Sequence, residues 1–132
     1  MISLILLSLA CICNSIMDVL VHHYPKSIFK NLNEKFWNGE ISWKNKYIDY
    51  DKGDLRLKKW FWNINKPVQF SDGWHLFKTL MIFFICLSVV LYVPLYNWHS
   101  PIYNFFIDFI IFGITWNVVF SLFYNKLLVS KK

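Results

Sequence analysis

The sequence predicts an all-α integral membrane protein with three transmembrane helices and an amphipathic cytoplasmic loop that lies in the membrane interface. Three long apolar segments, residues 2–21, 79–96 and 101–124, contain no lysine or arginine. Each is close to the ~20 residues that cross a bilayer. All fourteen lysines and arginines lie on one side of these segments. Because basic flanks stay in the cytoplasm, we expect the N-terminus outside and the C-terminus inside.

The order of the elements follows from the same flanks. The bases lie in residues 26–78 and in the tail, whereas the connection 97–100 has none. We therefore expect a single membrane domain over residues 1–132, with the membrane of a bacterial cell as its location. Its helices are predicted at about residues 2–24, 75–96 and 101–124, and its interfacial loop at residues 25–71.

Local signals support these boundaries. Pro25 ends the first helix, because the residue before a proline is disfavoured in the α region. Ser71 is the expected N-cap of the second helix, with Asp72 in its first turn and Pro94 in its last turn. Ser100 followed by proline is a good start signal for the third helix. The first segment has no basic n-region and no Ala-x-Ala-like site after it, so we expect it to be retained.

Composition agrees with a membrane protein of one domain. Hydrophobic residues make up 56% of the 132 residues and aromatic residues 20%, which excludes an ordinary soluble domain and a disordered chain. The net charge of +6 belongs to the loop and tail. Each base near an anionic leaflet contributes roughly 1 kcal/mol of attraction. The three cysteines lie in apolar segments, which favours small buried side chains over a disulfide framework.

The loop has the pattern of a membrane-binding segment. Residues 27–37 repeat apolar side chains at helical spacing and predict an amphipathic helix in the interface plane. Ten bases, five acids and four tryptophans lie between Pro25 and Ser71. An anionic headgroup layer accepts both kinds of side chain, so a peptide of residues 26–70 is expected to bind anionic vesicles. Single-stranded nucleic acid is a less favoured partner, because no nucleic-acid fold motif is present.

An acidic turn follows in residues 47–54. Its aspartates and Gly53 superficially resemble a calcium loop, but the required spacing and the closing glutamate are missing. We interpret these residues as a polar, solvated turn.

A candidate polar cluster lies at the cytoplasmic boundary. If the first two helices pack together, these side chains converge as Zn or Fe ligands or as acid and base at lipid headgroups. The alternative is that they are interfacial residues with solvated tips and a helix-capping carboxylate, and this alternative is favoured because no recognised two-ligand motif is present. The residues are Asp18, His22, His23, Asp72 and His75.

Asp108 lies two turns into the third apolar segment. An ionised carboxylate there is unfavourable, so it is expected to face the bundle, to be protonated, or to find a donor such as Asn104, Asn14, Ser15 or Ser88. Helix–helix contact is the favoured role, ahead of transport or a proton relay. Asn117 and Gly113 are predicted to make a similar interhelical contact.

Five strings together resemble a group of small bacterial or phage-encoded membrane proteins. They are MD at 17–18, KSIF at 26–29, FWN at 36–38, ISWKNKY at 41–47 and DGWHLFK at 72–78. The resemblance spans most of the chain from Met17 onward. It implies the fold and location already described, and it implies no reaction. The apolar stretch 64–70 is shorter than in the group, which affects the loop geometry.

Two functions follow as hypotheses. The first is a small multi-pass membrane component that packs its helices or binds a partner, as a homo-oligomer, with another membrane protein or as a phage-type pore former. The second is a metal-assisted interfacial enzyme that acts on lipid through the cytoplasmic cluster. The first is favoured, because the chain is small and carries no strong catalytic motif.

Overall fold

A computed structural model of the chain describes residues 1–96 and 100–129. It contains three helices long and apolar enough to cross a membrane: α1 (Ile2–His22), α4 (Gly73–Val90) and α5 (Pro101–Leu122). The last continues as one π-helical turn, Phe123–Leu127. The predicted transmembrane segments are therefore confirmed as long apolar helices.

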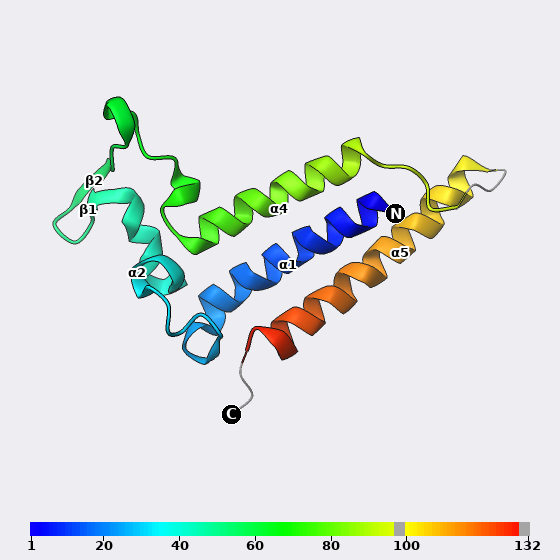
Figure 1. Cartoon of the computed structure of the whole chain (residues 1–132), viewed down its shortest axis with the longest axis horizontal. Coiled ribbons are helices and arrows are strands. Elements are labelled where there is room, and N and C mark those ends of the chain that lie inside the picture. The colour runs from blue at the N-terminus through cyan, green and yellow to red at the C-terminus, as the bar shows by residue number, and fades with distance from the viewer. Residues whose placement is uncertain (97–99, 130–132) are drawn as a thin grey trace.

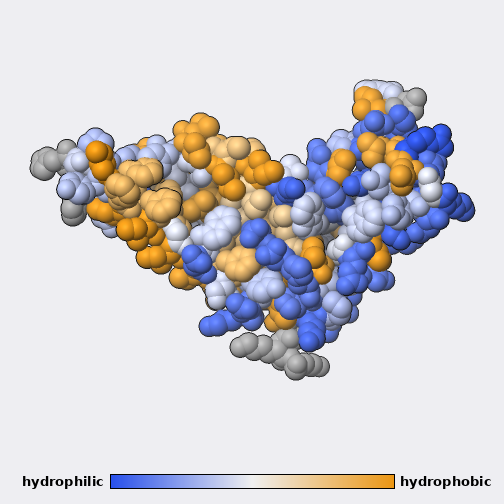
Figure 2. Space-filling model, turned by 180° about the vertical axis from the view of Figure 1, so that it is seen from behind, coloured by the Kyte–Doolittle hydropathy of each residue, from blue (hydrophilic) through white to orange (hydrophobic). Residues whose placement is uncertain are grey.

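The first helix lies between the other two (Figure 1). Because it has a neighbour on each side, its side chains are buried around most of its circumference, and Ala10, Cys11, Ser15 and Val19 are fully buried. The Cys11 thiol donates to the Trp116 carbonyl of α5 at 3.1 Å. The outer faces of α4 and α5 remain exposed and apolar, and orange gathers over this arm in Figure 2. Such faces match hydrocarbon.

The second long helix differs from its predicted limits. It ends at Val90, and not at residue 96, because Pro94 has no N–H and its ring would clash with the carbonyl of Val90 in a continued helix. Its N-cap is Asp72, and not Ser71. The third helix begins as predicted, with Ser100 at the N-cap and Pro101 in the first turn.

The all-α prediction is wrong for the loop, which contains a two-stranded antiparallel hairpin. The strands are β1 (Tyr47–Asp49) and β2 (Asp54–Leu57), with Tyr47 opposite Leu57. The turn depends on Gly53, whose φ of +79° is the left-handed region that favours glycine. The other loop elements are short: η1 (Tyr24–Lys26), α2 (Glu34–Trp37), α3 (Gly39–Ser42), η2 (Trp43–Lys46), η3 (Phe61–Asn63) and η4 (Val68–Phe70).

The predicted amphipathic helix over residues 27–37 is also wrong, and only its last turn is helical. Local side-chain hydrogen bonds compete with the helix here. The Ser27 hydroxyl accepts from the Phe29 N–H at 3.1 Å and donates to the Tyr24 carbonyl at 2.8 Å. Asn33 then caps α2 by accepting from the Lys35 N–H at 3.1 Å.

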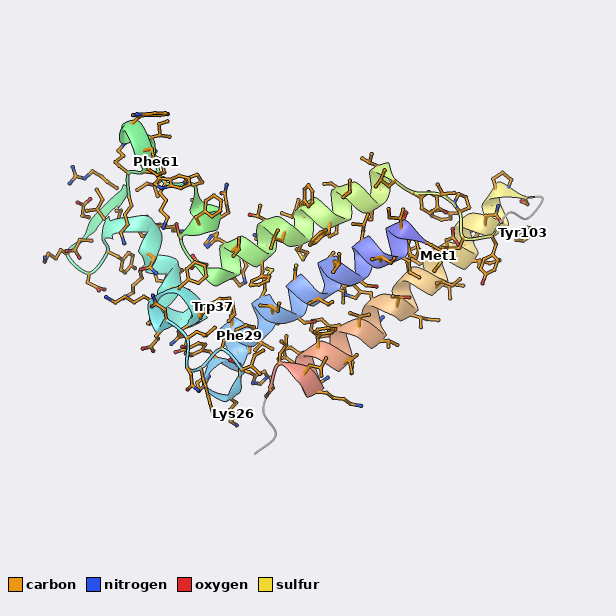
Figure 3. All side chains as sticks on the ribbon, viewed as in Figure 1. Met1, Lys26, Phe29, Trp37, Phe61 and Tyr103 are labelled. Carbon is orange, nitrogen blue, oxygen red and sulfur yellow. The ribbon has the colours of Figure 1, made fainter. Side chains whose placement is uncertain are left out.

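The core of the molecule lies at the end of the bundle where α1 stops and α4 begins, here called the loop end. The N–H of Ile28 donates to the Leu128 carbonyl at 3.0 Å and ties the loop to the C-terminal segment. Phe29 and Trp37 stack with ring centroids 5.0 Å apart, and Figure 3 labels both beside the end of α1. The buried cluster consists of Val19, Leu20, Tyr24, Phe29 and Leu128.

Candidate functional site

A close polar contact at the loop end joins Asp72 and His75. Asp72 has an extended backbone and caps α4, and its Oδ1 accepts from the His75 N–H at 2.9 Å. Its Oδ2 lies 2.7 Å from His75 Nδ1. Asp72 is fully buried, whereas the His75 side chain is 23% exposed. The carboxylate therefore fixes both the first turn of the helix and the orientation of the imidazole.

Close packing holds this pair in place. A Cβ on Gly73 would lie 3.1 Å from Leu20 Cδ1 and 3.3 Å from Trp37 Cε3, so the start of α4 sits directly against α1 and α2. The neighbouring Ser71 hydroxyl is buried without a hydrogen-bond partner among the described residues. The residues around Asp72 and His75, here called the dyad, thus come from three segments that are distant in sequence.

The other predicted cluster residues lie apart from this pair. Asp18 is half-buried on α1 and His22 is exposed at its end. The His23 ring contacts the Tyr124 ring, with centroids 5.3 Å apart. In residues 1–96 and 100–129, no hydrogen bond or ion pair joins Asp18 or His22 to the dyad.

The described residues do not assemble a metal site. Within the described part of the chain, no group of three or more histidines, cysteines, aspartates or glutamates is placed to hold a metal ion. The dyad offers at most two ligands, and a structural zinc site needs four. What the geometry does supply is an imidazole whose Nδ1 faces a carboxylate, which leaves Nε2 able to accept a proton.

Asp108 is buried as predicted, but its donors are different. Its Oδ2 accepts from the Tyr92 hydroxyl at 2.7 Å and from the Leu95 N–H at 3.1 Å. These donors come from the connection after α4, so the carboxylate ties that connection to α5. Tyr92 lies two residues beyond the end of α4, and Asp108 lies two turns into the antiparallel α5. Both residues are near the connection between the two helices, and this nearness is the signal in the sequence that would have paired them.

Within the described part of this chain, Asn117 makes a contact inside its own helix, so the predicted interhelical contact stays a prediction. Its amide donates to the Gly113 carbonyl of the same helix at 2.8 Å and is exposed. A Cβ on Gly113 would meet nothing within 4 Å, so no other helix among the described residues of this chain approaches it.

Each aspartate of the hairpin pairs with a base, which agrees with a polar turn. The Arg56 side chain donates to Asp54 and lowers the pKa of this carboxyl to about 2. A hydrogen bond to Asp51 raises the pKa of Lys44. The pairs are Asp49 with Lys52 (3.0 Å), Asp51 with Lys44 (2.8 Å) and Asp54 with Arg56 (2.7 Å).

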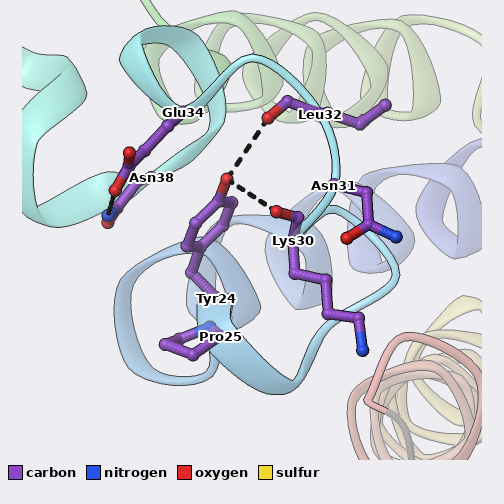
Figure 4. Close-up of a pocket in the computed structure, with 7 residues that line it drawn as sticks. All are labelled: Tyr24, Pro25, Lys30, Asn31, Leu32, Glu34 and Asn38. Atoms are coloured by element: carbon purple, nitrogen blue, oxygen red, sulfur yellow. Dashed lines mark hydrogen bonds between the residues drawn. The ribbon is translucent and has the colours of Figure 1, made fainter.

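A hollow of about 530 Å³ lies under the first part of the loop (Figure 4). The Tyr24 hydroxyl points between the carbonyls of Lys30 and Leu32, at 3.3 and 3.4 Å. The Asn38 amide donates to Glu34 at 3.1 Å on the other wall. These polar groups bind one another, so the hollow is a product of loop folding.

No family model, curated protein or solved structure matches this chain. The resemblance seen in the sequence therefore stays a prediction, and the function rests on the geometry alone.

Proposed function

We propose that the chain is a small multi-pass component of the cell membrane, with its N-terminus outside and its C-terminus inside. Its loop binds the anionic cytoplasmic leaflet, and the protein acts by presenting that anchored loop and its helices to a membrane partner. The support comes chiefly from one feature, an aromatic tip formed by residues 60–64.

The aromatic tip exposes large apolar side chains that a soluble surface would bury. Trp62 is 93% exposed, Phe61 is 67% exposed and Ile64 is 62% exposed. Trp62 also has a φ of +50°, a conformation that bulky residues rarely adopt and that is unfavourable by about 1–3 kcal/mol. Strain that holds a tryptophan outward favours a role in contact with a partner surface.

The position of the tip favours lipid as that surface. The loop extends sideways from the bundle, and Figure 3 labels Phe61 at the end of the loop's upper arm, to one side of the start of α4. The hairpin turn lies further from the helices along the bundle axis (Figure 1). Lys58, Lys59 and Lys66 flank the tip, and the combination of rings with bases suits an anionic headgroup layer.

Insertion of the tip predicts that Trp62 contacts lipid. The fluorescence of Trp62 is obtained in anionic nanodiscs as the difference between the emission of the full-length wild type and that of Trp62→Phe. This emission is expected to be blue-shifted and to be quenched by brominated lipid. High salt should weaken the quenching, because it screens the attraction of the bases. Emission at the wavelength of solvated tryptophan, unquenched at low salt, would contradict insertion.

A matched pair of variants separates insertion from folding. Trp62→Gly suits the positive φ, so it should preserve the free energy of unfolding while the protein loses salt-sensitive association of the loop with lipid. Leu55→Ala removes an exposed apolar side chain of the hairpin, away from the tip, and is expected to leave that association unchanged. If both variants lose the same amount of lipid association, the association depends on the overall hydrophobicity of the loop and not on the tip.

The orientation has its own test. In a background without the native cysteines, Ser100→Cys should react with an impermeant maleimide in intact cells, and Lys126→Cys only after permeabilisation. The opposite pattern would overturn the orientation, and with it the placement of the loop on the cytoplasmic leaflet.

The interfacial enzyme is the second candidate, and the Asp72–His75 dyad supports it. The dyad would act as an oriented base at lipid headgroups. It is the weaker candidate because the metal-assisted version needs a third ligand, which the described residues do not supply.

A further inference from the structure

A groove opens between α4 and α5 close to their connection, far from the loop. Its volume is about 330 Å³, and Leu7 of α1 contributes to its lining. Most of its wall is apolar, with three phenylalanines of α5 on one side. The polar side chains in the wall are Ser88, Tyr92 and Asp108.

One buried atom of a residue that lines this groove lacks a hydrogen-bond partner among the described residues. Asp108 is 2% exposed, and both of its donors bind Oδ2. Its Oδ1 is buried and has no hydrogen-bond partner in the described part of the chain. The Ser88 hydroxyl already donates to the Ile85 carbonyl at 2.8 Å, and the Tyr92 hydroxyl donates to Oδ2. A buried carboxylate oxygen left unpaired is strongly unfavourable, so a donor from outside the chain would be stabilising.

The aromatic rings indicate the charge of that donor. Phe105 and Phe109 stack with centroids 6.3 Å apart, and Tyr92 meets Phe112 edge to face at 6.3 Å. Ring faces attract cations, and more strongly where water is excluded. A carboxylate oxygen beside phenyl rings is a combination that binds an organic cation.

We propose that this groove binds an organic ammonium ion that has an N–H group and a compact apolar body. The N–H donates to Oδ1 of Asp108, a buried atom that the side chain turns toward the groove when the amine binds, and the body packs against the phenylalanines and Leu7. A Mg²⁺ or Ca²⁺ ion does not suit the groove, because it needs about six or more oxygen ligands. A lipid acyl chain does not suit it either, because it leaves Oδ1 unpaired.

The test uses full-length protein in nanodiscs, with 1-aminoadamantane as the probe and 1-adamantanol as an uncharged probe of similar shape. Calorimetric titration, corrected with empty nanodiscs, is expected to give saturable binding of the amine and at least tenfold weaker binding of the alcohol. Binding of both probes within threefold of each other, or no saturable binding of the amine, would overturn the proposal.

Three variants locate the bound amine. Asp108→Asn removes the charge and should weaken amine binding at least tenfold. Val89→Phe fills the groove from α4 without touching the carboxylate and should have a similar effect. Val90→Phe is its matched control, since Val90 is 78% exposed outside the groove, and it should bind the amine within twofold of the wild type.

Each outcome of this series decides the assignment. If Asp108→Asn fails to fold, the comparison of Val89→Phe with Val90→Phe still tests the groove. Unchanged binding in Val89→Phe would place the amine elsewhere in the bilayer or protein and refute the site. The result does not depend on the aromatic tip or on the orientation of the chain.

Discussion

Replacement of Asp72 by alanine is expected to lower the free energy of unfolding by about 2–4 kcal/mol. Loss of an N-cap accounts for about 1–2 kcal/mol. Loss of a charged hydrogen bond to a partly buried imidazole accounts for about 1.5–3 kcal/mol, and the two terms are not fully additive. Asp72 makes both interactions at once, through Oδ1 to the His75 N–H and through Oδ2 to the His75 ring.

The measurement is unfolding of the purified protein by SDS in mixed micelles, followed by far-UV circular dichroism. Asp72→Asn is the matched control, because its amide oxygen still caps the helix, and it is expected to lose less than half as much free energy. Ser71→Ala should change stability far less, since the Ser71 hydroxyl has no partner in the described residues. A loss below about 0.5 kcal/mol in Asp72→Ala would contradict the capping role.

The three long apolar helices could be predicted from the sequence because one strong physical term determines them. A run of about 20 apolar residues without a base has few alternatives to a membrane helix. Prolines then refine the ends, as at Pro101, where the third helix begins as predicted. Pro94 is predicted to lie inside the last turn of its helix. Its ring would clash with the Val90 carbonyl, so the helix ends at Val90, before the proline.

The loop could not be predicted in the same way, because weak local terms compete there. Helical spacing in residues 27–37 favoured a helix, but hydrogen bonds of Ser27 and Asn33 with the backbone stabilise turns instead. The pairing of Ile28 with Leu128 joins residues 100 positions apart. No local pattern reports such a contact, so the cluster at the loop end was not visible in the sequence.

The same limit applies to Asp108. Its burial follows from the cost of a carboxylate in hydrocarbon, and this part of the prediction agrees with its 2% exposure. Its donors were sought in asparagines and serines, whereas Tyr92 and the backbone of Leu95 provide them. A backbone N–H has no sequence signature, so the Leu95 donor could not be predicted from residue type.

Replacement of Gly39 by alanine is expected to lower the free energy of unfolding by about 1–3 kcal/mol, the usual range for an overpacked contact. An added Cβ would lie 2.8 Å from the Leu20 carbonyl oxygen and 3.1 Å from Val21 Cα. These are backbone atoms of the last turns of α1, so no side-chain rotation relieves the contact. The short helix α3 must move away from α1, and the loop loses this packing contact with the bundle.

Gly113→Ala is the matched control, because its Cβ would meet nothing within 4 Å in the interior of α5. It should stabilise the protein by about 0.5–1 kcal/mol, since alanine is the better helix former. The same SDS titration measures both variants, and the two changes in free energy should have opposite signs. A Gly39→Ala protein as stable as the wild type would mean that the loop is not held against α1. The aromatic tip would then have no fixed position relative to α4. The packing of the loop on α1 could not be the reason that the tip inserts into the membrane.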